Sequence, residues 1–239
     1  MSIDSGRLIA IGDVHGCAHA LDAILDCIGP APDDHLVFLG DLIDQGRDTR
    51  DVLDRVLGLR RQCRITLIRG NHEEMLYAAH ESEKALRYWE ACGGLAMLRS
   101  YFYGAKLSDI PDAHWKLLDQ CQDYLETDDY IFAHANYLPD EPMAAQPDFQ
   151  LRWALLDPEE AAPHVSGKTV VVGHTEQPNS EVLDLGFALC LDTACWRHGW
   201  LTAMELPSKR LWQASRWGIL RQADEQPDRG RVPLFARSA

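Results

Sequence analysis

The chain has 239 residues, of which 46% are hydrophobic and 25% are charged, and its formal net charge is −14. This composition is ordinary for a globular protein with a sizeable core. The acidic balance argues against nonspecific binding to nucleic acid or to an anionic membrane, because both need a basic surface. No apolar run approaches the roughly 18 residues of a membrane span, and the N-terminus shows no basic leader. We therefore expect a cytoplasmic protein with neither a nucleic-acid nor a membrane partner.

The first seventy residues alternate between short apolar runs and amphipathic segments. The runs at 8–11, 36–39 and 65–68 are expected to be strands. Segments 17–28 and 49–60 repeat apolar residues every three or four positions, which predicts helices. Gly29-Pro30 ends the first of them. This order predicts an α/β fold with parallel strands and crossover helices.

The rest of the chain changes character twice. Residues 74–128 lack strand signals and carry aromatic residues at helical spacings, so we expect a helical insertion that forms a wall or lid of the cleft. After His174, the stretches 188–191, 201–206 and 211–213 are expected to form a β meander that closes a second sheet. We expect one domain over 1–220 and a loose C-terminal tail over 221–239.

Five apolar runs lead directly into residues that can bind a metal ion. In an open α/β sheet, residues at the carboxyl ends of the strands gather at the edge where ligands bind. Five strands can therefore bring one set of metal ligands together. The set is Asp13, His15, Asp41, Asn71, His134 and His174. Asp41 is the expected bridging carboxylate between two ions about 3.5–4 Å apart, an arrangement that suits phosphate-ester hydrolysis.

The residue types narrow the choice of metal and the chemistry. Carboxylate, amide and imidazole ligands together suit Mn²⁺, Fe or Zn²⁺ better than Ca²⁺, which favours oxygen alone. His72, next to Asn71, is expected to have a different role. Asp44 stands three residues after Asp41 and can accept the Nδ1–H of His72. His72 Nε2 could then protonate a departing alkoxide as a general acid.

Taken in order, these segments resemble the signature of the phosphoprotein phosphatase family of calcineurin-like metallophosphoesterases, and the bacterial-type serine/threonine protein phosphatases are the most similar branch. The segments are Gly12–Gly16, Gly40–Gly46, Gly70–Glu73, His134–Ala135 and Gly173–His174. Cys92–Gly94 with Leu98–Tyr101, and Asp192–Thr193 with Gly199–Ala203, are similar to further stretches of the bacterial members. The resemblance covers about residues 7–213.

The resemblance implies a β-sandwich flanked by helices and a centre that holds two divalent metal ions, with Mn²⁺ the first candidate. It implies the same six metal ligands, with His72 and Asp44 as the acid pair. The implied reaction is hydrolysis of phosphoserine and phosphothreonine in proteins or peptides, with phosphotyrosine as a further substrate. A hydroxide shared by the two ions would attack the phosphorus in line.

One departure from the family pattern concerns the grip on the phosphate. The family usually carries an arginine where this chain has Gln45, a side chain that offers hydrogen bonds but no charge. Arg47, two residues on, is the candidate substitute, and Arg152, beside Trp153, loosely resembles the second phosphate-binding arginine of the family. Asn71 is expected to contact the phosphate as well.

Two alternatives to a protein phosphatase stay open. The first is a hydrolase of dinucleoside polyphosphates, such as diadenosine tetraphosphate, or of small phosphate esters at the same centre. Glu73 and Asp44 favour the protein-phosphatase branch over this one. The second is a phosphate-binding protein without catalytic activity, which Gln45 favours and the complete ligand set disfavours.

Overall fold

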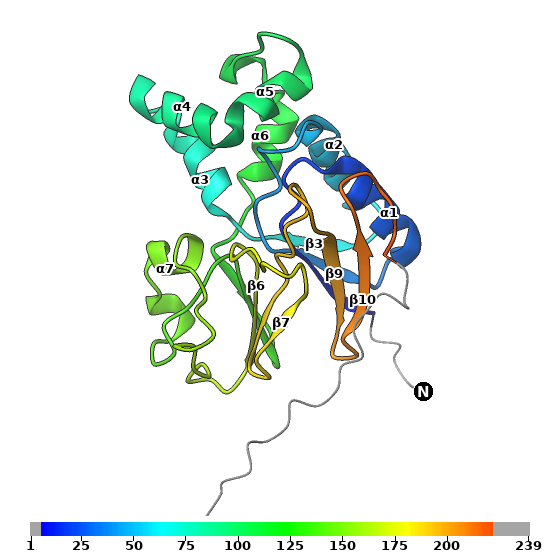
Figure 1. Ribbon diagram of the computed structural model, residues 1–239, viewed down its shortest axis with the longest axis vertical. Coiled ribbons are helices and arrows are strands. Elements are labelled where there is room, and N and C mark those ends of the chain that lie inside the picture. Colours follow the sequence, from blue (N-terminus) through cyan, green and yellow to red (C-terminus); the bar gives the residue numbers. More distant parts are fainter. Residues whose placement is uncertain (1–5, 222–239) are drawn as a thin grey trace, which may run out of the picture.

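The computed structural model describes residues 6–221. Almost all of the expected tail, 221–239, therefore lies outside the described residues. Two five-stranded sheets face each other in the lower half of Figure 1, and a group of helices stands above one end of them. Along the described part of the chain, no helix has both the length and the apolar character that crossing a membrane requires.

The first sheet has the strand order β10-β9-β1-β2-β3. Strands β1 (Leu8–Ile11), β2 (His35–Phe38) and β3 (Arg64–Leu67) run parallel, joined by helices α1 (Ala18–Ile28) and α2 (Thr49–Leu59). The predicted strand–helix alternation and the α/β class are thus confirmed. The two helices cover the outer face of this sheet, on the right of Figure 1.

The second sheet has the order β4-β5-β6-β8-β7. Its strands are β4 (Tyr124–Glu126), β5 (Tyr130–Ala133), β6 (Thr169–Val172), β7 (Leu183–Asp184) and β8 (Ala188–Cys190). Strands β5, β6 and β8 are parallel, and their outer face packs under the 3₁₀ turn Met143–Ala145 and helix α7 (Asp148–Arg152).

Side chains alternate between the two faces of each sheet, as a strand period of two requires. Ile9 and Ile11 pack against the helices, whereas Ala10 between them packs in the layer between the sheets. Phe132 and Met204 fill the same layer and are fully buried. This shared core holds the carboxyl ends of strands from both sheets at one end of the sandwich.

The insertion above the sheets is helical, as predicted, but ends earlier than expected. It comprises α3 (Asn71–Ala78), α4 (Glu83–Trp89), a π-helical turn (Glu90–Gly94), α5 (Leu95–Tyr101), a 3₁₀ turn (Leu107–Asp109) and α6 (Asp112–Leu118). The expectation of helix up to 128 is wrong, because β4 pairs antiparallel with β5 through a short turn. A strand of three residues is too short to show a period of two, so its partner strand defines it.

The predicted β meander after His174 is also wrong. Strand β8 lies parallel to β6 in the second sheet, whereas β9 (Leu201–Leu206) and β10 (Arg210–Ala214) extend the first sheet antiparallel to β1. The chain crosses between the sheets over 191–200. Leu191 donates its N–H to Val172 in one sheet, and Thr202 accepts from Gly12 in the other. Strand pattern alone does not say which sheet a strand joins.

Candidate metal centre

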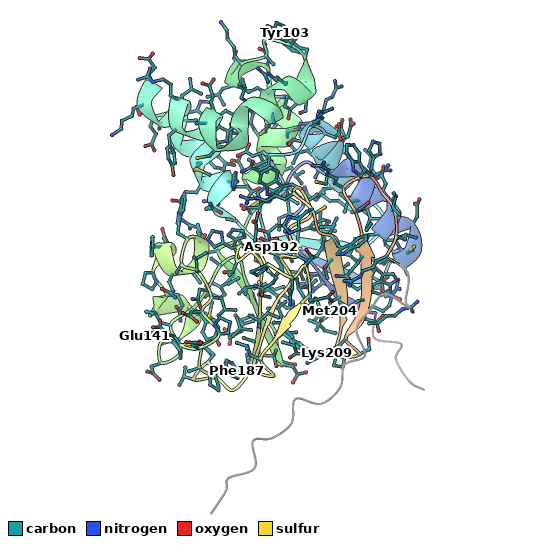
Figure 2. The ribbon with its side chains drawn as sticks, viewed as in Figure 1. Tyr103, Glu141, Phe187, Asp192, Met204 and Lys209 are labelled. Atoms are coloured by element: carbon teal, nitrogen blue, oxygen red, sulfur yellow. The ribbon has the colours of Figure 1, made fainter. Side chains whose placement is uncertain are left out.

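All six predicted metal ligands lie at one end of the sandwich, beneath the helical insertion. Loops after β1, β2, β5 and β6 carry five of them, and Asn71 is the first residue of helix α3 after β3. Figure 2 shows Asp192, which follows β8, at this same end. Phe187 and Lys209 mark the opposite end of the sandwich. Five of the six ligands are buried, and His174 is half-buried. The parallel strands thus bring together residues up to 161 positions apart.

Three of these residues adopt left-handed backbone conformations. The φ angles are 43° at His15, 48° at Asp41 and 60° at His174. Such angles are uncommon for residues other than glycine and tend to cluster at functional sites. Each lies within four residues of the end of a strand, where the left-handed conformation turns the backbone sharply. Local strain here serves the placement of the polar side chains.

Asp41 lies at the middle of the ligand set. Its Oδ2 atom is 3.5 Å from Nε2 of His15 and 3.5 Å from Nε2 of His134. Two groups of possible ligand atoms meet here, each within 4.8 Å, and Asp41 belongs to both. One group adds His15 and His72, and the other adds His134 and His174. A carboxylate common to two such groups is placed as a bridging ligand would be.

The hydrogen bonds of the imidazole rings suit metal binding. His15 Nδ1 lies 3.0 Å from the carbonyl oxygen of Ile43, and His134 Nδ1 lies 2.8 Å from that of Leu39. Each ring therefore donates at Nδ1 and presents the lone pair of Nε2 to Asp41, the usual arrangement for a ligating histidine. Burial lowers the pKa of both rings to about 4, so they are neutral at pH 7.

The remaining ligands complete a set of electron-pair donors. His134 Nε2 is 3.0 Å from Asn71 Oδ1, two acceptor atoms that face each other without a proton between them. His174 donates its backbone N–H to Asp13 at 3.0 Å, and its Nε2 lies 3.1 Å from the carbonyl oxygen of Trp153, which leaves Nδ1 as the lone-pair atom.

Buried carboxylates lie close together at this centre. Burial raises the pKa of Asp13, and the nearby carboxylates of Asp192 and Asp41 raise it further. Within residues 6–221, no lysine or arginine pairs with Asp13 or Asp41. Uncompensated buried carboxylates are costly, and divalent cations are the natural counter-ions. The donor set therefore fits two divalent metal ions.

Glu73 belongs to the Gly70–Glu73 segment, but the sequence did not show what its side chain does. Its Oε2 accepts the backbone N–H groups of Asp41 and Gly70, and its Oε1 accepts that of Leu42, all at 2.9 Å. The side chain is fully buried, and burial raises its pKa to about 7. Glu73 thus holds the strained loop that carries Asp41. A β-carbon on Gly70 would meet Asp41 Oδ1, so only glycine fits there.

The predicted acid pair is in contact, and Trp89 joins it. His72 Nδ1 lies 2.8 Å from Asp44 Oδ2, and Trp89 donates its indole N–H to the same oxygen at 2.9 Å. Burial alone would lower the pKa of His72, but the carboxylates of Asp41 and Asp44 raise it to about 9. With Nδ1 bonded to Asp44, Nε2 is the free ring nitrogen. Trp89 is fully buried, and the sequence motifs did not assign it a role at the centre.

The predicted phosphate-binding side chains differ in whether they already contact other parts of the protein. Gln45 donates its side-chain amide to the carbonyl oxygen of Cys92, at 2.8 Å. Arg152 is buried and pairs with Glu74 at 2.7 Å and with Asp123 at 2.6 Å. Both side chains are therefore engaged with the protein. Arg47 is exposed and makes no ion pair or side-chain hydrogen bond within residues 6–221.

The fold and the ligand set together define a metal-dependent phosphoesterase. The sequence profile of the calcineurin-like phosphoesterase family matches residues 6–198, so the chain belongs to that family. Over 65 residues, the chain is 45% identical to the PP2A-like serine/threonine-protein phosphatase PPG1 of Saccharomyces cerevisiae. The matched stretch covers 26% of this chain and 18% of that relative. The chain is 38% identical over 85 residues to serine/threonine-protein phosphatase 1 of Salmonella typhimurium, covering 35% and 37%.

Solved structures share the fold at low sequence identity. A protein described as a candidate diadenosine tetraphosphatase matches with a TM-score of 0.67 and 22% identity, over 90% of this chain and 95% of that one. A serine/threonine phosphatase from Saccharomyces cerevisiae matches with a TM-score of 0.62 and 16% identity, over 95% and 83%. These likenesses bear out the expected fold.

Proposed function

We propose that this chain is a two-metal phosphomonoesterase that hydrolyses phosphoserine and phosphothreonine in proteins, with phosphotyrosine as a further substrate. The observation that carries the proposal is the position of Asp41, common to two groups of ligand atoms, with the His72–Asp44 pair beside it. The partial relatives named as serine/threonine-protein phosphatases support the substrate class, although the match spans only 18% and 37% of their length.

In the proposed assignment, Asp13, His15 and Asp41 would hold one ion. Asp41, Asn71, His134 and His174 would hold the other. When bound, the two ions would polarise the phosphoryl group and supply hydroxide at neutral pH, a role that Mn²⁺, Fe or Zn²⁺ could fill, with Mn²⁺ the first candidate.

The chain's own contribution to the chemistry is a proton at a defined atom. His72 Nε2 would protonate the serine or threonine alkoxide as it leaves, because such an alkoxide is a poor leaving group. Asp44 orients the ring through Nδ1 and stabilises its protonated form. Trp89 donates its indole N–H to the same oxygen of Asp44 and so helps to fix that carboxylate. Asn71 and Arg47 remain the residues proposed to contact the phosphate itself.

A hydrolase of dinucleoside polyphosphates or small phosphate esters is the second candidate. The structural neighbour described as a candidate diadenosine tetraphosphatase favours it, but at 22% identity that likeness concerns the fold. The His72–Asp44 contact supports the first candidate, because strong general-acid assistance matters most for an alkoxide leaving group. A phosphate-binding protein without activity is the least supported reading, since both ligand groups and the acid pair are assembled.

The test combines metal dependence with substrate choice. The protein is stripped with a chelator and reloaded with Mn²⁺, and its activity is compared on a phosphoserine peptide, p-nitrophenyl phosphate and diadenosine tetraphosphate. We expect activity only with metal, and on the phosphopeptide rather than the dinucleotide. Asp41→Asn should lose both metal content and activity, whereas the exposed helix variant Asp26→Asn should keep them. Normal metal content and activity in Asp41→Asn would overturn the two-metal assignment.

A further inference from the structure

A pocket of about 350 Å³ lies beside the metal centre. Gly16 and Gln45 form part of its wall, and they follow His15 and Asp44 directly in the chain. Gly46 donates its backbone N–H to the carbonyl oxygen of His15 at 3.0 Å, which ties the two loops into one wall. The pocket therefore begins one residue along the chain from groups assigned to the centre.

The opposite wall comes from the C-terminal part of the fold. It is formed by Trp196, in the loop after β8, and by Arg216 and Trp217, in the turn after β10. Arg216 donates Nη1 to the carbonyl oxygen of Trp196 at 3.0 Å, and its guanidinium carbon lies 4.7 Å from the ring centroid of Trp217. These two contacts hold Arg216 in place at the rim. Arg47 lines the same pocket from the loop after β2.

The lining is cationic in a strongly acidic protein. Arg47 and Arg216 both reach the pocket, and neither forms an ion pair with a carboxylate within residues 6–221. Asp48 is the single carboxylate among the lining residues, and it forms no ion pair there either. Two unpaired arginines beside a phosphoesterase centre are suited to an anionic group, which each could hold through a planar pair of N–H donors.

The stacking of the arginines favours an anion over a nucleobase. A guanidinium stacked on an indole ring covers that face of the ring and keeps its own N–H edge free. Arg216 stacks on Trp217, and Arg197 stacks on Trp196 at 4.8 Å. Each indole thus already has a planar cation on one face. A base would compete for these rings, whereas a carboxylate or phosphate would bind the remaining N–H groups of Arg216, since Arg197 already pairs with Glu176 at 3.2 Å.

We propose that this pocket binds an anionic side chain of the phosphoprotein substrate, near the phosphoserine that is hydrolysed, with Arg216 as the residue that selects for it. The proposal rests on the proposed protein-phosphatase function. The anion is the carboxylate of Asp or Glu or a second phosphate. An extended chain advances about 3.3 Å per residue, and the pocket wall adjoins His15 and Asp44 in the chain, so we place the acidic residue one to three positions from the phosphoserine.

The test uses phosphoserine peptides that differ only at the flanking positions, which hold Ala, Glu, a second phosphoserine or Lys on either side. With Mn²⁺ present, the wild-type kcat/KM should be roughly tenfold higher on the Glu or doubly phosphorylated peptide than on the Ala peptide, the effect of one charge-assisted hydrogen bond. A higher kcat/KM on the Glu peptide would show that the pocket accepts a carboxylate. A higher kcat/KM only on the doubly phosphorylated peptide would show that it requires a phosphate. Arg216→Ala should bring the ratio close to one, and Arg216→Glu should shift the preference to the Lys peptide.

Arg210→Ala is the matched control. Arg210 also stacks on a tryptophan, Trp212, at 4.8 Å, but it lies at the other end of β10 and outside the pocket. This variant should keep the wild-type preference. The preference should also weaken as salt is added, because the arginines are exposed.

Three results would count against the proposal. Equal kcat/KM of the wild-type protein on the acidic and Ala peptides would overturn it while leaving the phosphatase function intact. A strong loss on diadenosine tetraphosphate in Trp217→Ala, with no change of peptide preference in Arg216→Glu, would show that the pocket binds a base and overturn it too. Hydrolysis of p-nitrophenyl phosphate but of no phosphopeptide would overturn the proposed function, and this inference with it.

Discussion

Glu73 and Asp41 hold each other in place. Glu73 Oε2 accepts the backbone N–H of Asp41 at 2.9 Å, and Asp41 Oδ1 accepts the backbone N–H of His72, the residue before Glu73, at 3.1 Å. The start of α3 and the loop after β2 are thereby locked together through buried bonds. The orientation of the central carboxylate thus depends on a residue that does not itself point at the metal site.

The first prediction concerns this lock. Glu73→Gln replaces one acceptor oxygen by an NH₂ group that would face a backbone N–H donor. We expect a loss of roughly 1–3 kcal/mol in the free energy of unfolding and a fall of about 10- to 100-fold in Mn²⁺ affinity. Calorimetric titration with Mn²⁺ and urea unfolding measure the two effects. The exposed variant Glu81→Gln should leave both unchanged. Wild-type Mn²⁺ affinity in Glu73→Gln would show that the lock does not orient Asp41.

The second prediction concerns the leaving group. His72→Asn should lower the rate on a phosphoserine peptide by roughly 10²–10⁴, the usual range of general-acid catalysis. The loss should be smaller on p-nitrophenyl phosphate, whose leaving group needs little protonation. Asp44→Asn should show the same ranking, less severely, because it removes the partner of the acid rather than the acid. Equal losses on the two substrates would instead make His72 a ligand or a structural residue.

The third prediction follows from the contact between Trp89 and Asp44. Trp89→Phe keeps an aromatic ring in the core and removes the N–H that Asp44 Oδ2 accepts. We expect the rate on a phosphoserine peptide to fall more than the rate on p-nitrophenyl phosphate, in the pattern of Asp44→Asn but more weakly. Trp115, a half-buried aromatic of α6, contacts Tyr77 edge to face, and the control variant Trp115→Phe should change both rates alike. If Trp89→Phe also changes both rates alike, the indole supports packing only.

The fourth prediction concerns Gln45. The side-chain amide of Gln45 donates a hydrogen bond to the carbonyl oxygen of Cys92, and Gly93 packs against the backbone of Gln45. We therefore expect an arginine at this position to point away from the helical insertion. We expect Gln45→Arg to lower KM for a phosphopeptide by about tenfold, the effect of one charged hydrogen bond. If Arg47 already fills that space, the gain should appear only in Gln45→Arg with Arg47→Ala. No change in KM from any of these variants would show that neither residue contacts the phosphate.

The fifth prediction concerns stability and pH at the start of the first sheet. Asp34 accepts hydrogen bonds from the backbone N–H of Arg7 at 2.9 Å, from its guanidinium, and from the N–H of Ala31 at 2.8 Å. The bond with Arg7 lowers the pKa of Asp34 in the folded protein. A carboxylate with a lowered folded pKa stabilises the fold above its unfolded value of about 3.9 and loses this effect as the pH falls through the folded value.

Asp34→Asn should therefore lower the free energy of unfolding at pH 7 by roughly 1–3 kcal/mol. The difference between wild type and variant should shrink as the pH falls below about 4. Urea unfolding at a series of pH values measures it, with the exposed neighbour Asp33→Asn as the control. A difference that is constant with pH would mean that the charge of Asp34 does not contribute.

The sequence by itself determined the strand-end motifs and the ligand set they assemble. Each motif lies within a few consecutive residues, in which an apolar strand runs into a glycine and then a polar side chain, so local pattern is enough to recognise it. Parallel strand order then brings the ends of β1, β2 and β3 together at one edge of the first sheet, whereas the ends of β5 and β6 reach them only because the second sheet faces the first. The contact between His72 and Asp44 was predictable for the same reason, because both residues belong to such motifs.

Only the tertiary structure decided which distant residues meet these motifs. Arg152 was predicted to hold phosphate, yet it pairs with Glu74, 78 positions away, while Gln45 bonds to Cys92, 47 positions away. The same holds for β9 and β10, which join β1 rather than β8, and for Arg216, which reaches the pocket beside the centre. Such contacts depend on how whole elements pack, and a side chain carries no local sign of the partner that packing will bring to it.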